Sequence, residues 1–439
     1  MSENITRIGL VGFGTVGSGV ARLILEESKS IAARTGVRLE LARVVDVDTT
    51  SARSVELPAG LLSNDLEGLL KDDSIAIAVE LVGGTTAAQD IMLKMLRARK
   101  HVVTANKALL AEHGDELYKT ALENNRCIAF EASCAGGIPI ISAIRTGLSA
   151  NRIEAMYGIL NGTCNFILSN MTKNNADFSE TLKLAQQRGY AESNPALDIN
   201  GSDSAHKLAI LASVCFGYRI NFKDIYVEGI ENISLEDIRY GKEMGYILKL
   251  LAVAERDRQD RISLRVHPSF ISRDNPLARV DGAFNAVSIF GNAVGQTMYY
   301  GRGAGMMPTA SAVVADIIEA ALGNSQRLFV NSTARSQRQQ AKMESIDNVT
   351  CRFYIRAMMK DQPGVVASYG KIFGDNNISL SGVLQHEGSG PDNTVPVVIT
   401  THTTEQRRIT AALEDMKSLD VISGRPICIR ILDIPEDKD

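Results

Sequence analysis

The stretch that decides the fold of this 439-residue chain is IGLVGFGTVG, residues 8–17. Its first four residues are apolar and predict a strand, and the glycines that follow fit the pattern G-x-G-x-x-G. Gly12 permits a tight turn, Gly14 lets the backbone approach a pyrophosphate, and Gly17 allows a helix to pack closely on the strand. The N-terminus of that helix offers free N–H groups to an anion. A glycine turn without a ligand is the alternative.

Strand and helix signals alternate from this loop through the first 150 residues. Strand-like runs lie at 8–11, 39–45, 75–82, 101–104 and 126–130, and helical patterns lie at 16–27, 87–98 and 109–124. This alternation predicts an α/β fold with a parallel sheet and helices on both faces. We therefore expect residues 1–150 to form a doubly wound, Rossmann-type dinucleotide-binding domain. Its candidate phosphate-loop residues are Gly12, Phe13, Gly14, Thr15, Val16 and Gly17.

The end of the second expected strand bears on the choice of cofactor. It reads VVDVD at residues 44–48. A carboxylate there can bond both ribose hydroxyls and repels a 2′-phosphate, so Asp46 favours NAD over NADP. Arg43 and Arg53 could still serve a phosphate, so both cofactors remain open.

The pattern changes after residue 150. Strand-like runs at 153–160, 262–270, 287–290 and 297–300 mix with helical patterns at 203–216 and 236–255, which predicts a second, mixed α/β domain over 151–323. The substrate-binding, catalytic and dimerisation roles expected of this domain are implied by the family resemblance given below. An amphipathic helix at 309–322 is expected to pack back on the first domain. The polar, aperiodic residues 324–349 predict a linker. Residues 350–432 then resume strand and helix signals, as a small separate domain.

Composition narrows the class of protein. The chain is 45% apolar and 22% charged, with a formal net charge of −4, which argues against nucleic acid as a main partner. The sequence contains neither an 18-residue apolar span nor a signal-peptide pattern. We therefore expect a cytoplasmic protein without a membrane role. Six cysteines are scattered without a C-x-x-C pair, which makes a disulfide framework or a zinc site improbable.

The segment GYAESNPALDINGSDSAHK, residues 189–207, concentrates charged residues in a loop. Its carboxylates Glu192, Asp198 and Asp203 precede Lys207, which opens an uncharged run, residues 208–218, that predicts a buried helix. A lysine partly shielded from water gives up its proton more readily, which suits proton transfer. Asp203 and Lys207 are four apart and share a helical face. The alternative is an ordinary capped helix with one ion pair.

Several further motifs resemble those of the homoserine dehydrogenase family. They are VVTANKALLA at 102–111, FEAS at 130–133, GGIP at 136–139 and LNGT at 160–163, and together with residues 189–207 they follow the family's order. The resemblance covers residues 5–432. It implies reversible NAD(P)H-dependent reduction of L-aspartate 4-semialdehyde to L-homoserine, by a single-activity form, since no kinase-like segment precedes residue 1.

The resemblance also implies roles for single residues. Lys207 matches the family's proton donor, and Lys107 matches a second lysine between the nicotinamide and the substrate. Glu192 matches the carboxylate that holds the substrate's ammonium group, with Asp203 assisting. The remaining matches are Tyr190 and Thr163 in the substrate pocket, Asp198 without a firm role, and Thr104, Lys107, Gly303 and Gly305 beside the cofactor. A lysine suits this chemistry because hydride attack on an aldehyde creates an alkoxide that needs a proton.

Two more sites follow from the resemblance. The family binds sodium or potassium in the loop that begins at Glu131, and the matching positions are Glu131, Cys134, Gly136 and Ile138. Cys134 stands where valine is usual. Cys164 stands where threonine is common, which puts details of the substrate pocket in doubt.

The last segment resembles an ACT domain, a regulatory module that pairs edge to edge and binds amino acids. Threonine is the implied effector, and a dimerising module without a ligand is the alternative. The candidate effector residues are Asp361, Pro363, Gly364 and Asn377. The expected assembly is a homodimer or a homotetramer.

Two other functions compete with a homoserine dehydrogenase. One is a nucleotide- and amino-acid-sensing protein that has lost catalysis, although the retention of Lys107 and Lys207 speaks against it. The other is an aspartate-semialdehyde dehydrogenase that forms an acyl-enzyme through Cys134, although no His and Arg stand near that cysteine in the sequence.

Overall fold

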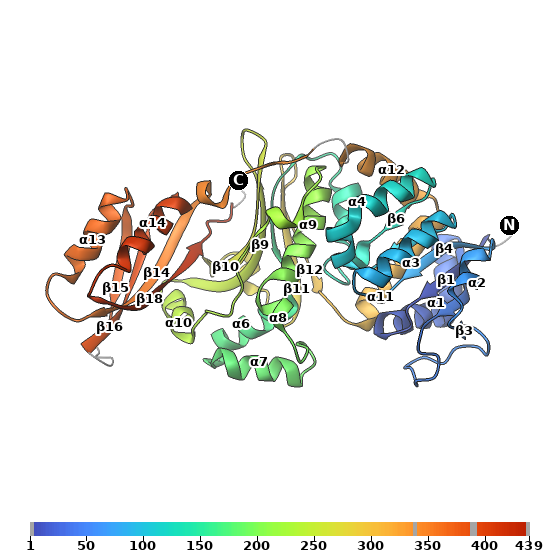
Figure 1. Cartoon of the computed structure of the whole chain (residues 1–439), viewed down its shortest axis with the longest axis horizontal. Coiled ribbons are helices and arrows are strands. Elements are labelled where there is room, and N and C mark those ends of the chain that lie inside the picture. Colours follow the sequence, from blue (N-terminus) through green and yellow to red (C-terminus); the bar gives the residue numbers. More distant parts are fainter. Residues whose placement is uncertain (1–3, 337–339, 387–392, 436–439) are drawn as a thin grey trace. The chain divides into compact units, whose positions relative to one another are not determined.

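A computed structural model describes residues 4–336, 340–386 and 393–435 (Figure 1). The chain forms two compact units, which are described separately. Unit 1 contains residues 1–160, 203–225 and 284–341, and unit 2 contains residues 161–202, 226–283 and 342–439.

Unit 1 is built on a six-stranded parallel sheet, as the alternation of strands and helices predicts. The strand order is β3-β2-β1-β4-β5-β6. The strands are β1 (Asn4–Val11), β2 (Val37–Val45), β3 (Leu62–Ser63), β4 (Ile75–Glu80), β5 (His101–Thr104) and β6 (Ile128–Ala129). The order reverses between β1 and β4, and in such sheets ligands bind beside that reversal, at the carboxyl ends of the strands.

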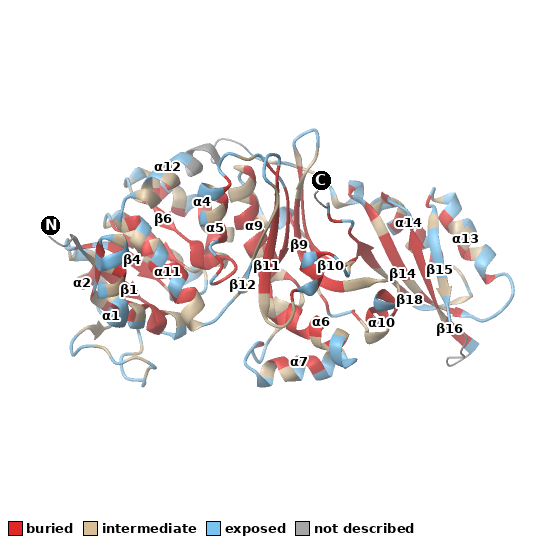
Figure 2. Ribbon diagram, turned by 180° about the vertical axis from the view of Figure 1, so that it is seen from behind, coloured by how far each residue is buried: buried red, intermediate tan, exposed pale blue. Residues whose placement is uncertain are grey.

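Helices cover this sheet and bury its apolar residues. They are α1 (Thr15–Thr35), α2 (Leu66–Lys71), α3 (Thr86–Arg97), α4 (Lys107–Glu123), α11 (Met306–Ala321) and α12 (Asn324–Ser336). Helix α1 packs on α11 and α3 packs on α4. Ile8 of β1, Ile24 of α1 and Ile317 of α11 belong to one buried core, and Figure 2 shows β1 and β4 of this sheet mostly in the colour of buried residues.

The expected linker at 324–349 is wrong for its first half, because residues 324–336 form α12. Phe329 is fully buried and lies edge-on against Tyr118, with ring centroids 5.8 Å apart. Phe329 thus anchors a helix whose other residues are mostly polar. Because the polar residues follow no helical period, the sequence pattern does not predict this helix. Shorter elements follow, namely β13 (Lys342–Met343) and the 3-10 turn η5 (Ile346–Asn348), while residues 337–339 lie outside the described part of the chain.

Unit 1 also contains three antiparallel strands and a buried helix. The strands β7 (Ile153–Ile159), β11 (Phe284–Gly291) and β12 (Gly295–Arg302) pair in the order β12-β11-β7. Helix α9 (Ser202–Phe216) carries Asp203 and Lys207 in its first two turns. The segment before β7 forms η1 (Glu131–Ser133), α5 (Ile140–Ser142) and η2 (Ala143–Gly147).

Unit 2 corrects the helix expected at 236–255. Helix α10 (Leu235–Glu243) ends early, Gly245 turns the chain at a φ of +84°, and β9 (Tyr246–Arg256) follows and pairs with β10 (Arg261–Ser272). Seven consecutive residues of β9, Leu248–Ala254, are buried. A strand covered on both faces reads as one continuous apolar run, which periodicity does not distinguish from a buried helix. The other elements are α6 (Gly162–Asn174), α7 (Phe178–Gln187), α8 (Ala196–Ile199), β8 (Tyr226–Val227) and η4 (Pro276–Arg279).

The C-terminal module has the order β-α-β-β-α-β, with the two-residue strand β17 (Thr404–Glu405) before its second helix. Its elements are β14 (Thr350–Lys360), α13 (Val365–Asp375), β15 (Leu380–Gln385), β16 (Thr394–Thr401), α14 (Gln406–Met416) and β18 (Ile422–Ile431). We expected a separate domain here. Strand β18 instead pairs with β10 as well as with β14, so this module belongs to the same compact unit as α6 and α10.

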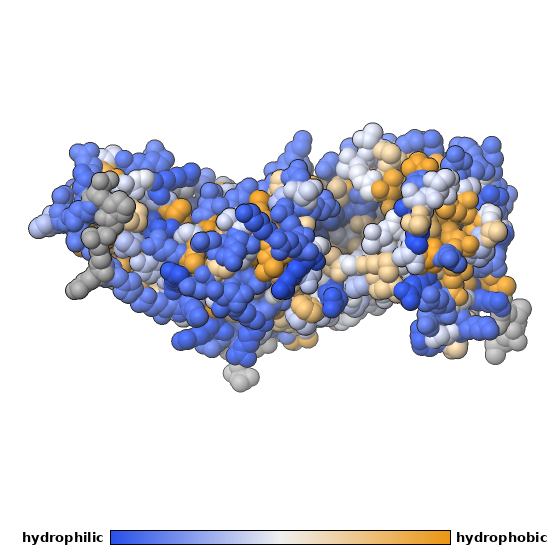
Figure 3. Space-filling view, turned by 90° about the horizontal axis from the view of Figure 1, so that it is seen from below, coloured by the Kyte–Doolittle hydropathy of each residue, from blue (hydrophilic) through white to orange (hydrophobic). Residues whose placement is uncertain are grey.

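Among the described residues, no single helix is long and apolar enough to cross a membrane. Only the pair of helical segments 306–321 and 324–331, bent by 89°, passes that test of length and composition. The face in Figure 3 is mostly hydrophilic, with separate apolar areas.

Candidate active site

Two lysines meet one buried carboxylate in unit 1. Lys207 Nζ lies 2.7 Å from Asp203 Oδ2, and Lys107 Nζ lies 2.8 Å from Asp203 Oδ1. Lys207 Nζ also donates to the carbonyl of Leu160 at 2.7 Å. Lys107 is the first residue of α4, which Asn106 caps by accepting from the backbone N–H of Leu109. The first turns of α4 and α9 therefore bring together residues that are far apart in the sequence.

The charges in this cluster stabilise one another. Burial alone would raise the pKa of Asp203, but the ammonium groups of Lys207 and Lys107 outweigh it and hold that pKa below its usual value. The side chain of Lys207 is 10% exposed and that of Lys107 is 38% exposed. The cluster thus keeps two cations beside one anion, an arrangement that can stabilise a developing oxyanion and deliver a proton.

Asn285 is a residue of this cluster that the sequence does not single out. Its Nδ2 donates to the same Leu160 carbonyl at 3.0 Å, while its Oδ1 is buried without a hydrogen bond. Gly303 lies against it, since a Cβ at that glycine would collide with the Asn285 amide. The sequence signal that could have identified Asn285 is a polar residue at the start of the apolar strand β11.

The other expected substrate residues lie in unit 2. Thr163 Oγ1 donates to the carbonyl of Tyr190 at 2.6 Å, and Asp198 accepts from Asn161 Nδ2 at 2.8 Å. Glu192 is exposed. Asp198 therefore ties α8 to the start of α6, a contact that accounts for its presence without any substrate.

The glycine loop fits a dinucleotide. Gly12 has a φ of +96° and no room for a Cβ, and a Cβ at Gly17 would collide with the Gly12 carbonyl. A Cβ at Gly14 would instead meet no atom within 4 Å, which leaves open space at the N-terminus of α1. This is the space that a pyrophosphate needs to approach the backbone.

Asp46 fixes the geometry of this loop. Its Oδ2 accepts from the backbone N–H of Phe13 at 2.5 Å, and its Oδ1 accepts from that of Asp48 at 2.9 Å. Arg53 Nη2 lies 3.8 Å from Asp46 Oδ1 and 3.2 Å from Asp48 Oδ2, whereas Arg43 pairs with Asp72 at 3.4 Å. Of the two arginines considered for a 2′-phosphate, Arg53 is the one beside Asp46.

Glu80 is a second residue that the sequence analysis missed. It ends β4 fully buried, and its carboxylate accepts from Thr104 Oγ1 at 2.7 Å and from the backbone N–H of Val82 at 2.8 Å. Burial raises the pKa of Glu80. Thr104 in turn accepts from the backbone N–H of Asn106 at 3.0 Å. Glu80 therefore positions the strand ends that lead to Lys107. The sequence signal that could have identified Glu80 is a carboxylate at the end of the apolar run IAIAVE.

The expected cation loop is tightly folded. The carboxylate oxygens of Glu131 accept from the backbone N–H groups of Ile141 and Ser142, each at 2.7 Å, and burial raises the pKa of this carboxyl. Ala135 and Gly136 have positive φ values, and Gly136 packs against the carbonyl of Gly303.

The surroundings of this loop limit what it can bind. Gly305, at a φ of +122°, leads into α11, where burial and the charge of Glu131 raise the pKa of Asp316 to about 8. Within the described ranges, no group of three or more His, Cys, Asp and Glu side chains could hold a metal ion. Burial raises the pKa of Cys134 to about 12, which argues against a nucleophilic role for this thiol.

The expected effector loop lies in the C-terminal module. Asp361 donates its backbone N–H to the carbonyl of Asn393 at 2.8 Å, and Gly364 precedes α13 at a φ of +92°. Pro363 stands between these residues, and Asn377 turns the chain after α13 at a φ of +54°.

Comparisons with known proteins agree across nearly the whole chain. The family model described as homoserine dehydrogenase matches residues 139–318, and the one for its NAD-binding domain matches residues 12–131. The chain is 44% identical to a homoserine dehydrogenase of Helicobacter pylori, over 97% of this chain and 98% of that protein. It is 40% identical to one of Neisseria gonorrhoeae, over the same shares of the two chains. A crystal structure of a homoserine dehydrogenase from Thiobacillus denitrificans matches 98% of this chain and 99% of its own, with a TM-score of 0.89 and 39% identity.

Proposed function

Because this chain belongs to the homoserine dehydrogenase family, we propose that its paired lysines, Lys107 and Lys207, carry out the proton transfer of that reaction. The chain is an NAD(P)-dependent oxidoreductase acting on a CH–OH group, which interconverts L-aspartate 4-semialdehyde and L-homoserine. The observation that carries the residue assignment is the contact of both ammonium groups with Asp203, at 2.7 and 2.8 Å.

The proposed roles follow from charge and burial. When bound, the nicotinamide cofactor supplies the hydride, and the loop from Gly12 to Gly17 would hold its pyrophosphate. Lys207 donates a proton to the aldehyde oxygen as that oxygen becomes an alkoxide. Lys107, which is more exposed, adds a second positive charge that stabilises the same oxygen. Asp203 orients both ammonium groups through its two carboxylate oxygens.

The remaining substrate contacts are proposed from the family match. Glu192 binds the substrate's ammonium group, with Asp203 assisting, and Thr163 and Tyr190 line the pocket. A Glu192→Gln variant is expected to raise the KM for homoserine with a smaller change in kcat. An unchanged KM would contradict this role.

NAD is the proposed cofactor of choice. The position of Asp46 supports this proposal, since it holds the phosphate loop and would face a 2′-phosphate. Arg53, beside it, supports some use of NADP. The structure of a mutant homoserine dehydrogenase from a hyperthermophilic archaeon, 28% identical to this chain, is a complex with NADPH. Equal or reversed Michaelis constants for NADH and NADPH would refute the preference.

A monovalent cation, sodium or potassium, is proposed at the loop of Glu131, Cys134, Gly136 and Ile138. Because the Glu131 carboxylate already binds two backbone N–H groups, backbone carbonyls would supply most ligands. Cysteine in place of valine is harmless to such a site. The same activity in sodium, potassium and a bulky organic cation would refute a catalytic role for the ion.

The C-terminal module is proposed to be an ACT domain that binds threonine. Its β-α-β-β-α-β order and the turn from Asp361 to Gly364 support this. Threonine is expected to inhibit the full-length enzyme, and Asp361→Ala or Asn377→Ala is expected to relieve that inhibition. An enzyme that millimolar threonine leaves uninhibited would rule this effector out.

A homodimer or homotetramer in the cytoplasm is the proposed state. Strand β12 lies at the end of its strand order and carries Tyr300, which is 56% exposed, so it offers an edge and an aromatic anchor for a second copy. A monomer in sedimentation experiments would contradict this assembly.

The alternative of an inactive sensor is tested by mixing the protein with homoserine and NAD+ or NADP+, since a sensor would produce no reduced cofactor.

A further inference from the structure

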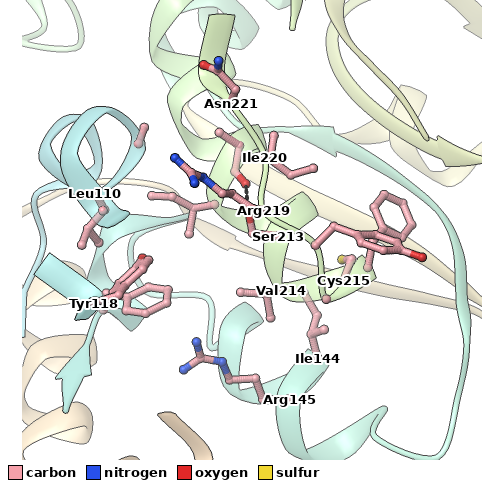
Figure 4. A pocket seen from close by; sticks show the side chains of 18 of the residues that line it. Leu110, Tyr118, Ile144, Arg145, Ser213, Val214, Cys215, Arg219, Ile220 and Asn221 are labelled. Atoms are coloured by element: carbon pink, nitrogen blue, oxygen red, sulfur yellow. Dashed lines mark hydrogen bonds between the residues drawn. The ribbon is translucent and has the colours of Figure 1, made fainter. Parts of the chain in front are cut away.

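A cavity in unit 1 has no role in the proposed reaction. Its volume is about 740 Å³, and residues of α4, of α9 and of the segment 144–153 line it (Figure 4). Lys107, Asp203 and Lys207 are not among its lining residues, and neither is any residue of the glycine loop. Cavities of this size hold small organic molecules.

Arg145 brings a positive charge to the lining of this cavity. Arg145 places its guanidinium 4.7 Å from the ring centroid of Phe130, and its Nε is buried without a hydrogen bond. The charges of Asp316 and Glu131 act on this guanidinium, although within the described ranges neither carboxylate forms a hydrogen bond or an ion pair with it. Arg219, which also lines the cavity, is paired with Asp115. Because a buried guanidinium nitrogen without a hydrogen bond is costly, Arg145 would gain from an anionic ligand in the cavity.

Apolar side chains line part of the cavity near this charge, and charged ones such as Glu112 and Asp115 line other parts of it. In Figure 4, Arg145 lies at the lower edge of the labelled side chains. Tyr118, Ile144 and Val214 lie around it, and Leu110 lies beyond Tyr118. A guanidinium beside apolar side chains fits a carboxylate attached to a hydrocarbon body, because the carboxylate can form paired hydrogen bonds while the body displaces water from those side chains.

The two helices that line the cavity also carry the catalytic cluster. Helix α4 begins with Lys107 and lines the cavity from Leu110 to Tyr118, while α9 carries Asp203 and Lys207 and lines it from Ala209 onward. Glu112 of α4 also lies 3.5 Å from His206 of α9. A ligand that changes the spacing of these helices therefore changes the contact of Lys107 with Asp203.

We propose that this cavity between α4 and α9, with Arg145 as its anchor, binds a small monocarboxylate with an aliphatic or aromatic body and thereby alters turnover. The binding itself does not depend on the roles proposed for the lysines. The effect on turnover rests on the proposed function, so the two are measured separately.

Binding is tested by calorimetry on the full chain with 4-methylpentanoate, and with 4-methylpentanamide as its uncharged counterpart. The acid is expected to bind at least tenfold more tightly than the amide, and Arg145→Gln is expected to remove this difference. Arg152→Gln, at an exposed neighbouring arginine paired with Glu154, is the matched control and is expected to bind as the parent does. Absence of binding, or equal binding of acid and amide, would overturn the proposal.

A second variant guards against misfolding of Arg145→Gln. Val214→Phe fills the cavity without touching its charge and is expected to abolish binding too. The acid is also expected to change kcat of the parent enzyme without competing with homoserine, and to leave kcat of Val214→Phe unchanged. Competitive inhibition that persists in both variants would place the acid in the catalytic site and overturn the proposal. If the unmodified protein shows no homoserine dehydrogenase activity, the proposed function is contradicted, while the binding result stands.

Discussion

Replacing Lys207 by methionine separates catalysis from stability in the lysine cluster. Methionine keeps the length and apolar stem of lysine and removes only the ammonium group. If that group is the proton donor, kcat should fall by about 10²–10⁴-fold, the usual contribution of a positioned general acid. This loss equals roughly 3–5 kcal/mol of transition-state stabilisation.

The structure limits how far the same change can destabilise the fold. Asp203 keeps its contact with Lys107 at 2.8 Å, and the Leu160 carbonyl keeps the hydrogen bond from Asn285 at 3.0 Å. The stability cost should therefore stay below the ~3–5 kcal/mol that a buried charge costs when it loses all partners. The double variant Asp203→Asn/Lys207→Met removes the remaining carboxylate charge and should regain part of that stability without regaining turnover.

The assay is steady-state oxidation of homoserine, followed by the absorbance of the reduced cofactor, with cofactor affinity and thermal unfolding measured on the same samples. Lys107→Met is the comparison, and it should lose less activity because Lys107 is the more exposed lysine. A Lys207→Met enzyme within tenfold of the parent, or one that loses less than Lys107→Met, would refute the assignment.

Three further predictions concern the cofactor, pH and the C-terminal module. Asp46→Ala should raise kcat/KM for NADP relative to NAD by roughly tenfold, since like charges a few ångströms apart cost about 1–4 kcal/mol; an unchanged ratio would remove Asp46 from cofactor selection. Asp316, whose pKa rises from 3.8 to about 8 on folding, contributes stability that is present below the lower value and lost as pH approaches the upper one. Asp316→Asn should therefore flatten the fall in melting temperature over this window, whereas Glu319→Gln on the same helix should not. Asp237 is fully buried and forms an ion pair with Arg356 of β14, so Asp237→Asn should lower the free energy of unfolding in urea by about 3–5 kcal/mol. Glu236 also pairs with Arg356 but is more exposed, so Glu236→Gln should cost far less.

Local patterns predicted most of unit 1. The strand expected at 101–104 coincides with β5, and the parallel sheet follows from the alternation that starts at the glycine loop. This succeeded because each βα step contains its own signals, an apolar run followed by a helix. The same reasoning failed at 246–255, where burial on both faces removes the period, and at 324–336, where one buried phenylalanine outweighs a polar pattern.

The sequence by itself determined the α/β class, the family and the identity of the charged residues that matter. It also placed Asp203 and Lys207 on one helical face, because four residues make about one turn. Only the tertiary structure decided that Lys107 reaches the other oxygen of Asp203, that Asn285 shares the Leu160 carbonyl, and that Arg145 lines a cavity with its Nε unbonded. These contacts join segments from distant parts of the chain, and no local pattern records which charges folding brings within hydrogen-bond distance.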